Sequence, residues 1–288
     1  MNSRGDQRVL LSVLAHPDDE SFGMGGTLAK YARQGVEVHL VCATRGEAGE
    51  VPPEYLEQGV PIRELREREL ICAAEQLGIR QLHFLDYRDS GMTGSPENEH
   101  PQALVNAPLE EVAGKVLQII RDIEPQVVLT FDPIGGYYHP DHIAIHQAAT
   151  EAFFLARDRG EEQAAGSSVP QKLYYHTIPK QLIRFNVRLL SFLGKDPSRW
   201  GKNQDIDLTE LAEKTFPVHA RIAYGKVRKQ KAAAASCHAS QGGAGLIGGV
   251  WRMIFRLFGS RDEDQFMRAY PDPQDGELEK DLFANLSV

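Results

Sequence analysis

Two short runs of histidine and aspartate hold the residues of this 288-residue chain that are best suited to chemistry. The first, at residues 16–20, reads HPDDE, and the second, at residues 139–142, reads HPDH. Imidazole and carboxylate groups bind divalent metals and also transfer protons in catalysis. The two runs lie far apart in the sequence, so only the fold can bring them together.

Two histidines and one carboxylate, with a fourth position left to water, are the ligands typical of hydrolytic zinc, whereas structural zinc sites are closed and rich in cysteine. We assign His16 and Asp19 as ligands because residues three apart at the start of a helix project the same way. His142 from the second run is the third ligand. The expected metal is Zn²⁺, and the same ligands also suit Fe²⁺ or Co²⁺.

The remaining polar residues of the two runs are candidates for proton transfer. A water in the open position would have its pKa lowered from about 15.7 towards 7, and Asp18, which is not needed as a ligand, can accept its proton. His139 faces the same cavity, where its protonated form can stabilise an oxyanion or protonate a leaving amine. Asp141 or another carboxylate can hold the tautomer of His139. In the alternative interpretation, the aspartates cap helices and the histidines are ordinary loop residues.

The elements that must position these residues are predicted by short apolar runs that alternate with longer helical patterns. Strands are expected at 9–15, 36–43, 81–86 and 127–132, and helices at 24–34, 63–77, 109–124 and 142–157. This alternation predicts an α/β fold with a Rossmann-like, doubly wound, mostly parallel sheet and helices on both faces. In the strand order 3-2-1-4-5, the first and fourth strands are neighbours, and the loops after them meet in one crevice.

The second half of the chain is less regular. We expect a strand at 172–178, helices at 180–193, 218–235 and 277–286, and a glycine-rich stretch at 242–249. The cationic amphipathic segment 250–259 is interpreted as packed core, as a lid over an apolar aglycone or, less favoured, as a peripheral membrane contact. A catalytic core at 1–170 and a C-terminal elaboration at 171–288, which completes the sheet and the substrate pocket, are expected, with a single domain as the alternative.

The overall composition narrows the classes of function. Apolar residues make up 42% of the chain, enough for a packed core. The 40 acidic residues exceed the 32 basic residues, and the net charge of −8 argues against a nucleic-acid partner. Three widely spaced cysteines without a CxxC motif, and no predicted signal or transmembrane segment, favour a cytoplasmic protein with reduced thiols. No GxGxxG motif follows the first strand, which argues against dinucleotide binding.

On the complete motifs AHPDDE at 15–20 and HPDH at 139–142, the chain resembles the PIG-L/LmbE family of zinc-dependent N-deacetylases, which act on N-acetylglucosamine-containing molecules. The resemblance covers mainly the first half of the chain. It implies the same roles: zinc ligands, Asp18 as general base and His139 as electrophilic or acid partner. Further segments resemble the mycothiol and bacillithiol branches of the family. These segments imply substrate contacts by Glu47, Arg66, Asp89 and Tyr137.

Other interpretations of these residues stay open. Glu47, Arg66 and Asp89 also suit surface salt bridges. His238 lies in a segment that resembles an H-x-S-Q motif of the family, and it either lines the pocket or ends a helix.

The expected activity is metal-dependent removal of the N-acetyl group from an N-acetylglucosaminyl small molecule, for example a mycothiol- or bacillithiol-type precursor. One alternative is an amidase that cleaves a larger thiol S-conjugate. Another is a non-catalytic sugar- or nucleotide-binding module on a Rossmann-like sheet. The aglycone and the oligomeric state are not predicted.

Overall fold

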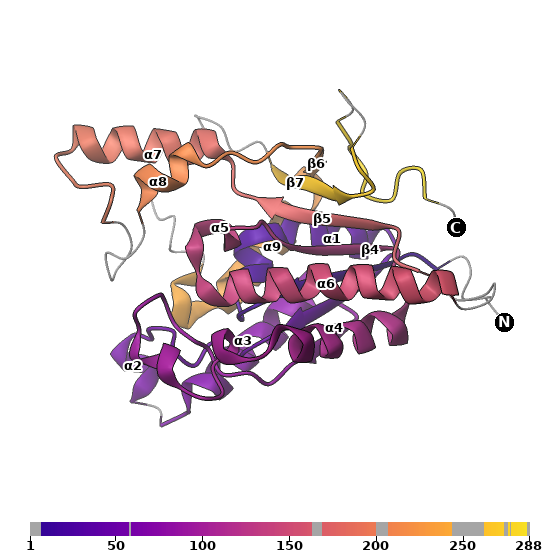
Figure 1. The fold of residues 1–288 in the computed structure, drawn as a ribbon. Helices are drawn as coiled ribbons and strands as arrows, with labels where there is room; N and C mark the ends of the chain where they lie inside the picture. Colours follow the sequence, from indigo (N-terminus) through magenta and orange to yellow (C-terminus); the bar gives the residue numbers. More distant parts are fainter. Residues whose placement is uncertain are drawn as a thin grey trace.

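The computed structural model describes residues 7–57, 59–162, 169–199, 207–243, 262–273, 276 and 278–286. Its strands form a seven-stranded sheet in the order β3-β2-β1-β4-β5-β7-β6. Helices cover both faces of this sheet (Figure 1). The predicted α/β class is therefore confirmed.

The parallel part of the sheet consists of β1 (Val9–Leu14), β2 (Glu37–Cys42), β3 (Gln81–Phe84), β4 (Val127–Phe131) and β5 (Lys172–Thr177). All neighbouring pairs among these five strands are parallel, and the predicted order 3-2-1-4-5 is confirmed. Every residue of β1 and β4 is buried. Such strands need apolar side chains on both faces, which explains their continuous apolar sequence.

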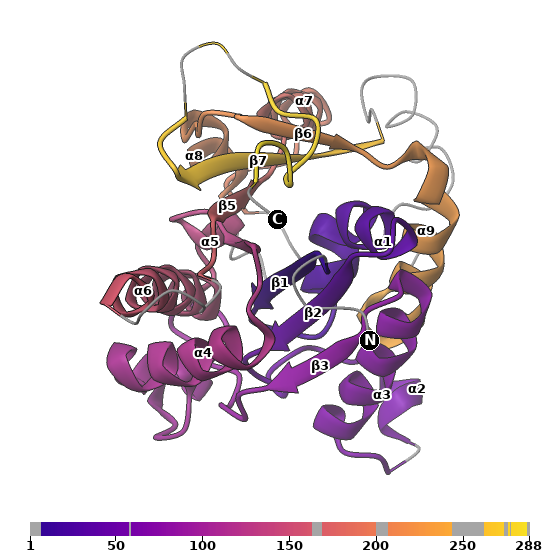
Figure 2. The same ribbon diagram turned by 90° about the vertical axis from the view of Figure 1, so that its right-hand side faces the viewer.

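The helices of the first half form two layers (Figure 2). One layer contains α1 (Gly25–Arg33) and α3 (Ile62–Leu77), and the other contains α4 (Leu109–Ile123) and α6 (Pro140–Glu162). These helices confirm the four predicted ones, although α6 begins two residues earlier than expected and extends further. α3 ends at Gly78, whose φ of 75° gives the left-handed conformation that glycine adopts most easily.

Shorter elements lie in the connections of the first half. They are η2 (Glu20–Met24), α2 (Pro53–Leu56), η3 (Pro96–Glu99), η4 (Leu104–Asn106) and α5 (Gly135–Tyr138). The turn of π-helix η2 begins at Glu20, the last residue of the first histidine–aspartate run, and leads into α1.

The C-terminal part adds two antiparallel strands, β6 (Ala220–Ala223) and β7 (Glu263–Tyr270), to the edge beside β5. The predicted helix at 218–235 is wrong in its first half, where β6 is followed by η5 (Gly225–Val227) and only then by α9 (Arg228–Cys237). Ala220 and Ile222 are buried against β7, and this pairing outweighs the helix propensity of the local sequence. β7 itself was not predicted.

The predicted helix at 277–286 is also wrong in its described residues. Glu279 forms an isolated bridge to Ala220, and residues 282–285 form a turn. Glu279 accepts hydrogen bonds from Lys172 and Arg268, so this segment is held to the sheet in a non-helical conformation.

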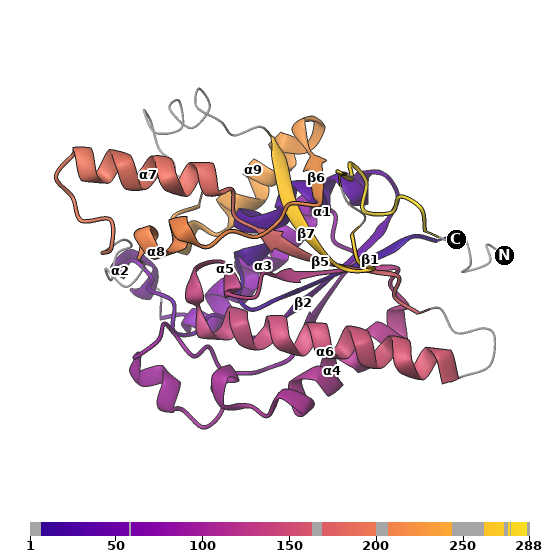
Figure 3. The ribbon, with the colours of Figure 1, turned by 45° about the horizontal axis from the view of Figure 1, so that its top comes forward.

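Two helices pack against each other beyond the carboxyl end of the sheet, namely α7 (Lys180–Phe192) and α8 (Leu208–Glu213) (Figure 3). α7 was predicted at 180–193, whereas α8 was not predicted. Leu190 and Leu211 belong to a small apolar cluster that also contacts Tyr137, next to the second histidine–aspartate run. Segment 250–259 and most of the glycine-rich stretch 242–249 lie outside the described residues.

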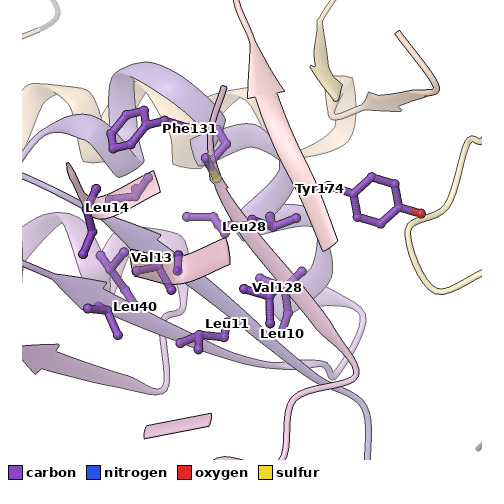
Figure 4. Packing of buried hydrophobic residues seen from close by; sticks show 14 of the residues in the cluster. Leu10, Leu11, Val13, Leu14, Leu28, Leu40, Val128, Phe131 and Tyr174 are labelled. Carbon is purple, nitrogen blue, oxygen red and sulfur yellow. The ribbon is translucent and has the colours of Figure 1, made fainter. Parts of the chain in front are cut away.

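The main apolar core lies between the sheet and its helices (Figure 4). Leu10, Leu11 and Val128 from neighbouring strands are completely buried, as is Leu28 from α1. The same cluster includes Tyr174 of β5 and Phe266 of β7, so it continues into the second half of the chain.

Cys72 of α3 and Cys237 of α9 form a disulfide, and Cys42 is free and buried. The expectation of reduced, unpaired thiols is therefore wrong for Cys72 and Cys237. They are 165 residues apart in the sequence and meet only because α3 and α9 pack together on one face of the sheet. None of the helices in the described ranges is long and apolar enough to cross a membrane.

Candidate active site and metal centre

The two histidine–aspartate runs meet at the carboxyl ends of the neighbouring strands β1 and β4. His16 Nδ1 and His142 Nε2 are 3.2 Å apart. One carboxylate oxygen of Asp19 lies 3.6 Å from His16 Nδ1, and the other lies 3.3 Å from His142 Nε2. The fold thus brings together the three residues that the sequence predicts as metal ligands.

The distance between the two histidine nitrogens and the distance from Asp19 Oδ1 to His142 Nε2 fit a tetrahedral metal ion. Ligand atoms about 2.0–2.1 Å from such an ion are separated from each other by about 3.3 Å. The other nitrogen of each histidine is anchored, since His142 Nδ1 donates to Gly135 O at 3.0 Å and His16 Nε2 donates to Asp141 Oδ2 at 3.1 Å. The lone pair of His142 Nε2 therefore faces Asp19 and His16, as ligation requires.

The charges around His16 also favour a cation at this position. Burial lowers the pKa of His16, but the carboxylates of Asp89, Asp141 and Asp19 outweigh burial and raise its pKa well above the ordinary value. Asp19 has its pKa lowered by His142 and His16 in spite of its burial. The cluster attracts positive charge, whether a proton or a metal ion.

His139 lies beside the ligand cluster. Its ring centroid is 4.6 Å from that of His16 and 4.8 Å from that of His142, and all three can offer a nitrogen to one ion. Burial and the two neighbouring imidazoles lower the pKa of His139 to about 2, so the ring is neutral. Its Nδ1 accepts a hydrogen bond from the backbone N–H of Asp141 at 3.2 Å, which leaves Nε2 as the donor.

The carboxylate of Asp141 does not have the predicted partner. It lies against His16, and it accepts hydrogen bonds from the backbone N–H and the hydroxyl of Ser90. These two donors hold the carboxylate away from His139. The tautomer of His139 is therefore set by the backbone of Asp141, and the side chain of Asp141 orients the candidate ligand His16.

Asp18 lies next to the cluster with its carboxylate held by Arg66, whose Nη2 donates to Oδ2 at 2.9 Å. Burial raises the pKa of Asp18 to about 6, although Arg66 opposes this shift. The backbone φ of Asp18 is 118°, a value that residues with a side chain rarely adopt. The sequence alone does not predict this strained conformation, because it depends on the surrounding hydrogen bonds.

A cavity of about 680 Å³ opens beside the cluster. Six of the predicted site residues line it, namely His16, Asp18, Arg66, Asp89, Tyr137 and His139. The ring of Tyr137 meets those of His139 and His142 edge to face. The cavity therefore joins one candidate metal ligand, His16, to polar side chains that follow β1, β3 and β4.

Two predicted substrate-binding residues do not line this cavity. Glu47 accepts a hydrogen bond from the backbone N–H of Asp89 at 3.2 Å. His238 is fully buried and donates from Nε2 to Glu20 at 2.7 Å. Burial lowers the pKa of His238, but the hydrogen bond to Glu20 and the charge of Glu20 outweigh burial and raise it.

The C-terminal part contributes cavity residues that sequence analysis missed. Ser240 and Gln241 line the cavity. The backbone N–H and the hydroxyl of Ser240 both donate to Glu69 at 2.7 Å. The H-x-S-Q resemblance around His238 was the one signal that pointed to this segment.

The fold and the site together define an α/β protein with a buried His–Asp–His cluster that could hold a metal ion. Residues 11–153 match the family model described as PIG-L, GlcNAc-PI de-N-acetylase. A "1D-myo-inositol 2-acetamido-2-deoxy-alpha-D-glucopyranoside deacetylase 2" from Catenulispora acidiphila is 35% identical, with 99% of each chain covered. The chain belongs to the PIG-L family of de-N-acetylases.

Solved structures with less than 25% identity share the fold. The N,N'-diacetylchitobiose deacetylase of Pyrococcus horikoshii has a TM-score of 0.58 at 20% identity and covers 93% of this chain and 86% of its own. GalB of Pseudomonas putida, a 4-carboxy-2-hydroxymuconate hydratase, has a TM-score of 0.61 at 20% identity, with 93% and 99% covered. Because a hydratase has this fold too, the reaction must be argued from the site.

Proposed function

We propose that this protein removes the N-acetyl group from an N-acetylglucosaminyl compound in which the sugar is joined to a small polar aglycone such as inositol. The observation that carries the proposal is the meeting of His16, Asp19 and His142 beside a cavity that His16 and Asp18 line. Family membership and the name of the Catenulispora relative agree with this substrate class.

The chemistry of the site follows from the positions of its donors and acceptors. His16, Asp19 and His142 would hold a divalent metal, which would supply a water of lowered pKa and an electrophile for the acetyl carbonyl. Asp18, with a raised pKa, accepts the proton of the attacking water. The neutral Nε2–H of His139 donates to the carbonyl oxygen as negative charge develops on it. Asp18 then returns the proton to the amine nitrogen as the C–N bond breaks, which releases acetate.

The substrate contacts belong to the same proposal. Asp89 and Tyr137 line the cavity and can bind sugar hydroxyls and the acetyl group, respectively. Arg66 also lines it, and its hydrogen bonds to Gly46 O and Asp18 hold one wall in place. Glu47 would act through Asp89 rather than directly, since it binds the Asp89 backbone.

Zinc is the proposed metal, with Fe²⁺ or Co²⁺ as alternatives that suit the same ligands. A cytoplasmic location stays a prediction. The Cys72–Cys237 disulfide is the observation that argues most against it, because cytosolic thiols are usually kept reduced.

The test is acetate release from N-acetylglucosaminyl inositol and N-acetylglucosaminyl malate, with metal content measured on the same sample. We expect release that stops after chelation and returns when zinc is added. Fe²⁺ and Co²⁺ should be compared in the restoration step. Absence of release from both substrates by metal-loaded protein would contradict the proposed substrate class.

The second candidate is an amidase that acts on a larger thiol conjugate. Residues 91–95 and 240–242 also line the cavity, and this extent favours a substrate larger than the acetylated sugar alone. The ratio of kcat/KM for the acetylated sugar and for a conjugate amide distinguishes the two candidates.

A further inference from the structure

A buried carboxylate links the candidate general base to the C-terminal part of the chain. Glu20 is completely buried in η2, and its Oε2 accepts the backbone N–H of Asp18 at 3.0 Å. Its Oε1 accepts from the Ser21 hydroxyl at 2.6 Å and from His238 Nε2 at 2.7 Å. His238 follows directly after α9, 218 residues further along the chain than Glu20.

Glu20 acts on a peptide unit that is held from both sides. The carbonyl of Pro17 accepts a hydrogen bond from Arg66 Nη2, and the N–H of the same peptide, which belongs to Asp18, donates to Glu20. Asp18 has a φ of 118°, and such a conformation persists only where the surroundings determine it. The direction of the Asp18 side chain therefore depends on these two hydrogen bonds, together with the bonds that the Asp18 carbonyl accepts from the N–H groups of Ser21 and Phe22.

Glu20 in turn needs a partner. It is the third consecutive carboxylate after Asp18 and Asp19, and it is removed from solvent. Burying a carboxylate is costly unless hydrogen-bond donors or a cation surround it, and His238 adds to the Ser21 hydroxyl a second donor to Oε1. Without the hydrogen bond from His238, we expect the Glu20 side chain to rotate away from the backbone N–H of Asp18.

His238 is itself held on both sides along the chain. Cys237 is joined to Cys72 of α3, and Ser240 donates twice to Glu69 of the same helix. The ring of His238 does not line the cavity, and it contacts Phe22 as well as Glu20. Its position suits an effect on Asp18 that passes through Glu20.

We propose that His238 and Glu20 form a positioning pair that sets the backbone conformation of Asp18, so that the rate of hydrolysis depends on the C-terminal part of the chain. The proposal rests on the proposed function, in which Asp18 is the general base. Neither member of the pair touches the substrate, and both are positioning residues.

The first test compares two variants of His238. His238→Leu removes the donor, and we expect kcat to fall about 10- to 100-fold while KM stays within two-fold and the metal content is unchanged. His238→Gln supplies an amide N–H near the original Nε2 and should recover kcat to within about three-fold of the wild type. The control is Ser236→Ala on the exposed side of α9, whose hydroxyl donates to Ala232 O, and it should behave as the wild type.

The second test separates positioning from general loss of structure. In an Asp18→Asn background, His238→Leu should not lower the residual rate further, because the group on which it acts is already absent. Equal fold-losses in both backgrounds, a rise in KM at unchanged kcat, or loss of metal would each overturn the proposal. Thermal unfolding is measured for every variant, and Glu20→Gln replaces His238→Leu if the latter does not fold.

The third test does not depend on activity. A crystal structure of His238→Leu should show the Asp18 peptide turned, with φ outside the positive region and the hydrogen bond to Glu20 lost. An unchanged Asp18 would overturn the positioning pair even if the protein proved to act on a different substrate. Absence of acetate release by the wild type would instead count against the proposed function.

Discussion

At the scale of single residues, three consecutive carboxylates have three different surroundings. Asp19 faces the two histidines of the candidate metal centre, Asp18 faces Arg66 and the cavity, and Glu20 is buried beneath Asp18. Successive side chains of a tight loop point in different directions, so neighbouring residues of the same chemical type can have separate functions.

This division predicts different outcomes for two substitutions in the site. Asp18→Ala should keep the metal and lower kcat by about 10²- to 10⁴-fold, because a positioned general base contributes about that much. His16→Ala should lose both metal and activity. Metal analysis and acetate release measure these effects, and Asp122→Ala on the exposed side of α4 is the control. Metal-free Asp18→Ala protein would contradict the assignment.

A second prediction at this scale concerns stability and pH. Burial lowers the pKa of His176 in β5 to about 4, with Lys231 adding to the shift and Asp264 and Asp19 opposing it. The unfolded chain, with a histidine pKa of about 6.5, binds more protons between pH 4 and 6.5, so the free energy of unfolding falls as pH falls through this range.

The expected loss between pH 7 and pH 5 is about 1–2 kcal/mol, allowing for the partial exposure of the His176 ring. Urea unfolding at the two pH values measures it. In His176→Phe this contribution should disappear, while His100→Phe at the end of η3 should keep the wild-type difference. An equal pH dependence in His176→Phe and the wild type would contradict the prediction.

At the scale of elements, α3 and α9 form one functional pair on the same face of the sheet (Figure 2). α3 carries Arg66 and Glu69, and α9 leads directly into His238 and Ser240. The disulfide between Cys72 and Cys237 joins the two helices next to these residues. The wall of the cavity therefore depends on how these helices pack.

We predict that Cys72→Ser lowers the free energy of unfolding by about 2–4 kcal/mol, the usual effect of removing a disulfide that closes a long loop. Denaturant unfolding with and without reductant measures the change, and reductant should have little effect on the variant. Thiol titration of unfolded protein should find one thiol, Cys42, before reduction and three after it. Three thiols without reductant would contradict the disulfide.

At the scale of the whole molecule, the C-terminal segment is fastened to the sheet by buried charges. Glu279 accepts from Lys172 Nζ at 2.6 Å, from the Tyr174 hydroxyl at 2.6 Å and from Arg268 Nη1 at 2.9 Å. These partners lie on β5 and β7. The sheet and the apolar core both include residues on each side of the predicted domain boundary between 170 and 171. We therefore propose that residues 1–170 and 171–288 unfold as one unit.

Glu279→Ala should lower the free energy of unfolding by about 3–5 kcal/mol, because it leaves two buried cations without their carboxylate. The matched control is Glu64→Gln, which removes the exposed ion pair with Arg68 and should have little effect. Denaturant unfolding followed by fluorescence and by circular dichroism tests both statements. Two separate transitions in the wild type would contradict a single unit.

Local patterns in the sequence were enough to predict the first five strands and four of the helices between them. Buried parallel strands require continuous apolar runs, and each helix has its own stop signal, such as Gly78 after α3. The set of candidate ligands was also predictable, because His16, Asp19 and His142 lie in two compact motifs and the strand order brings the ends of β1 and β4 together.

Contacts between distant segments decided the rest. The local sequence of 218–235 favours a helix, but pairing with β7 makes its start a strand. Three contacts join residues that no spacing in the sequence relates. They are the hydrogen bond between Asp141 and His16, the disulfide between Cys72 and Cys237, and the hydrogen bond from His238 to Glu20. Hydrophobic periodicity reports which face of an element is buried. It does not report which side chain from elsewhere in the chain will meet that face, and the tertiary structure alone determines this.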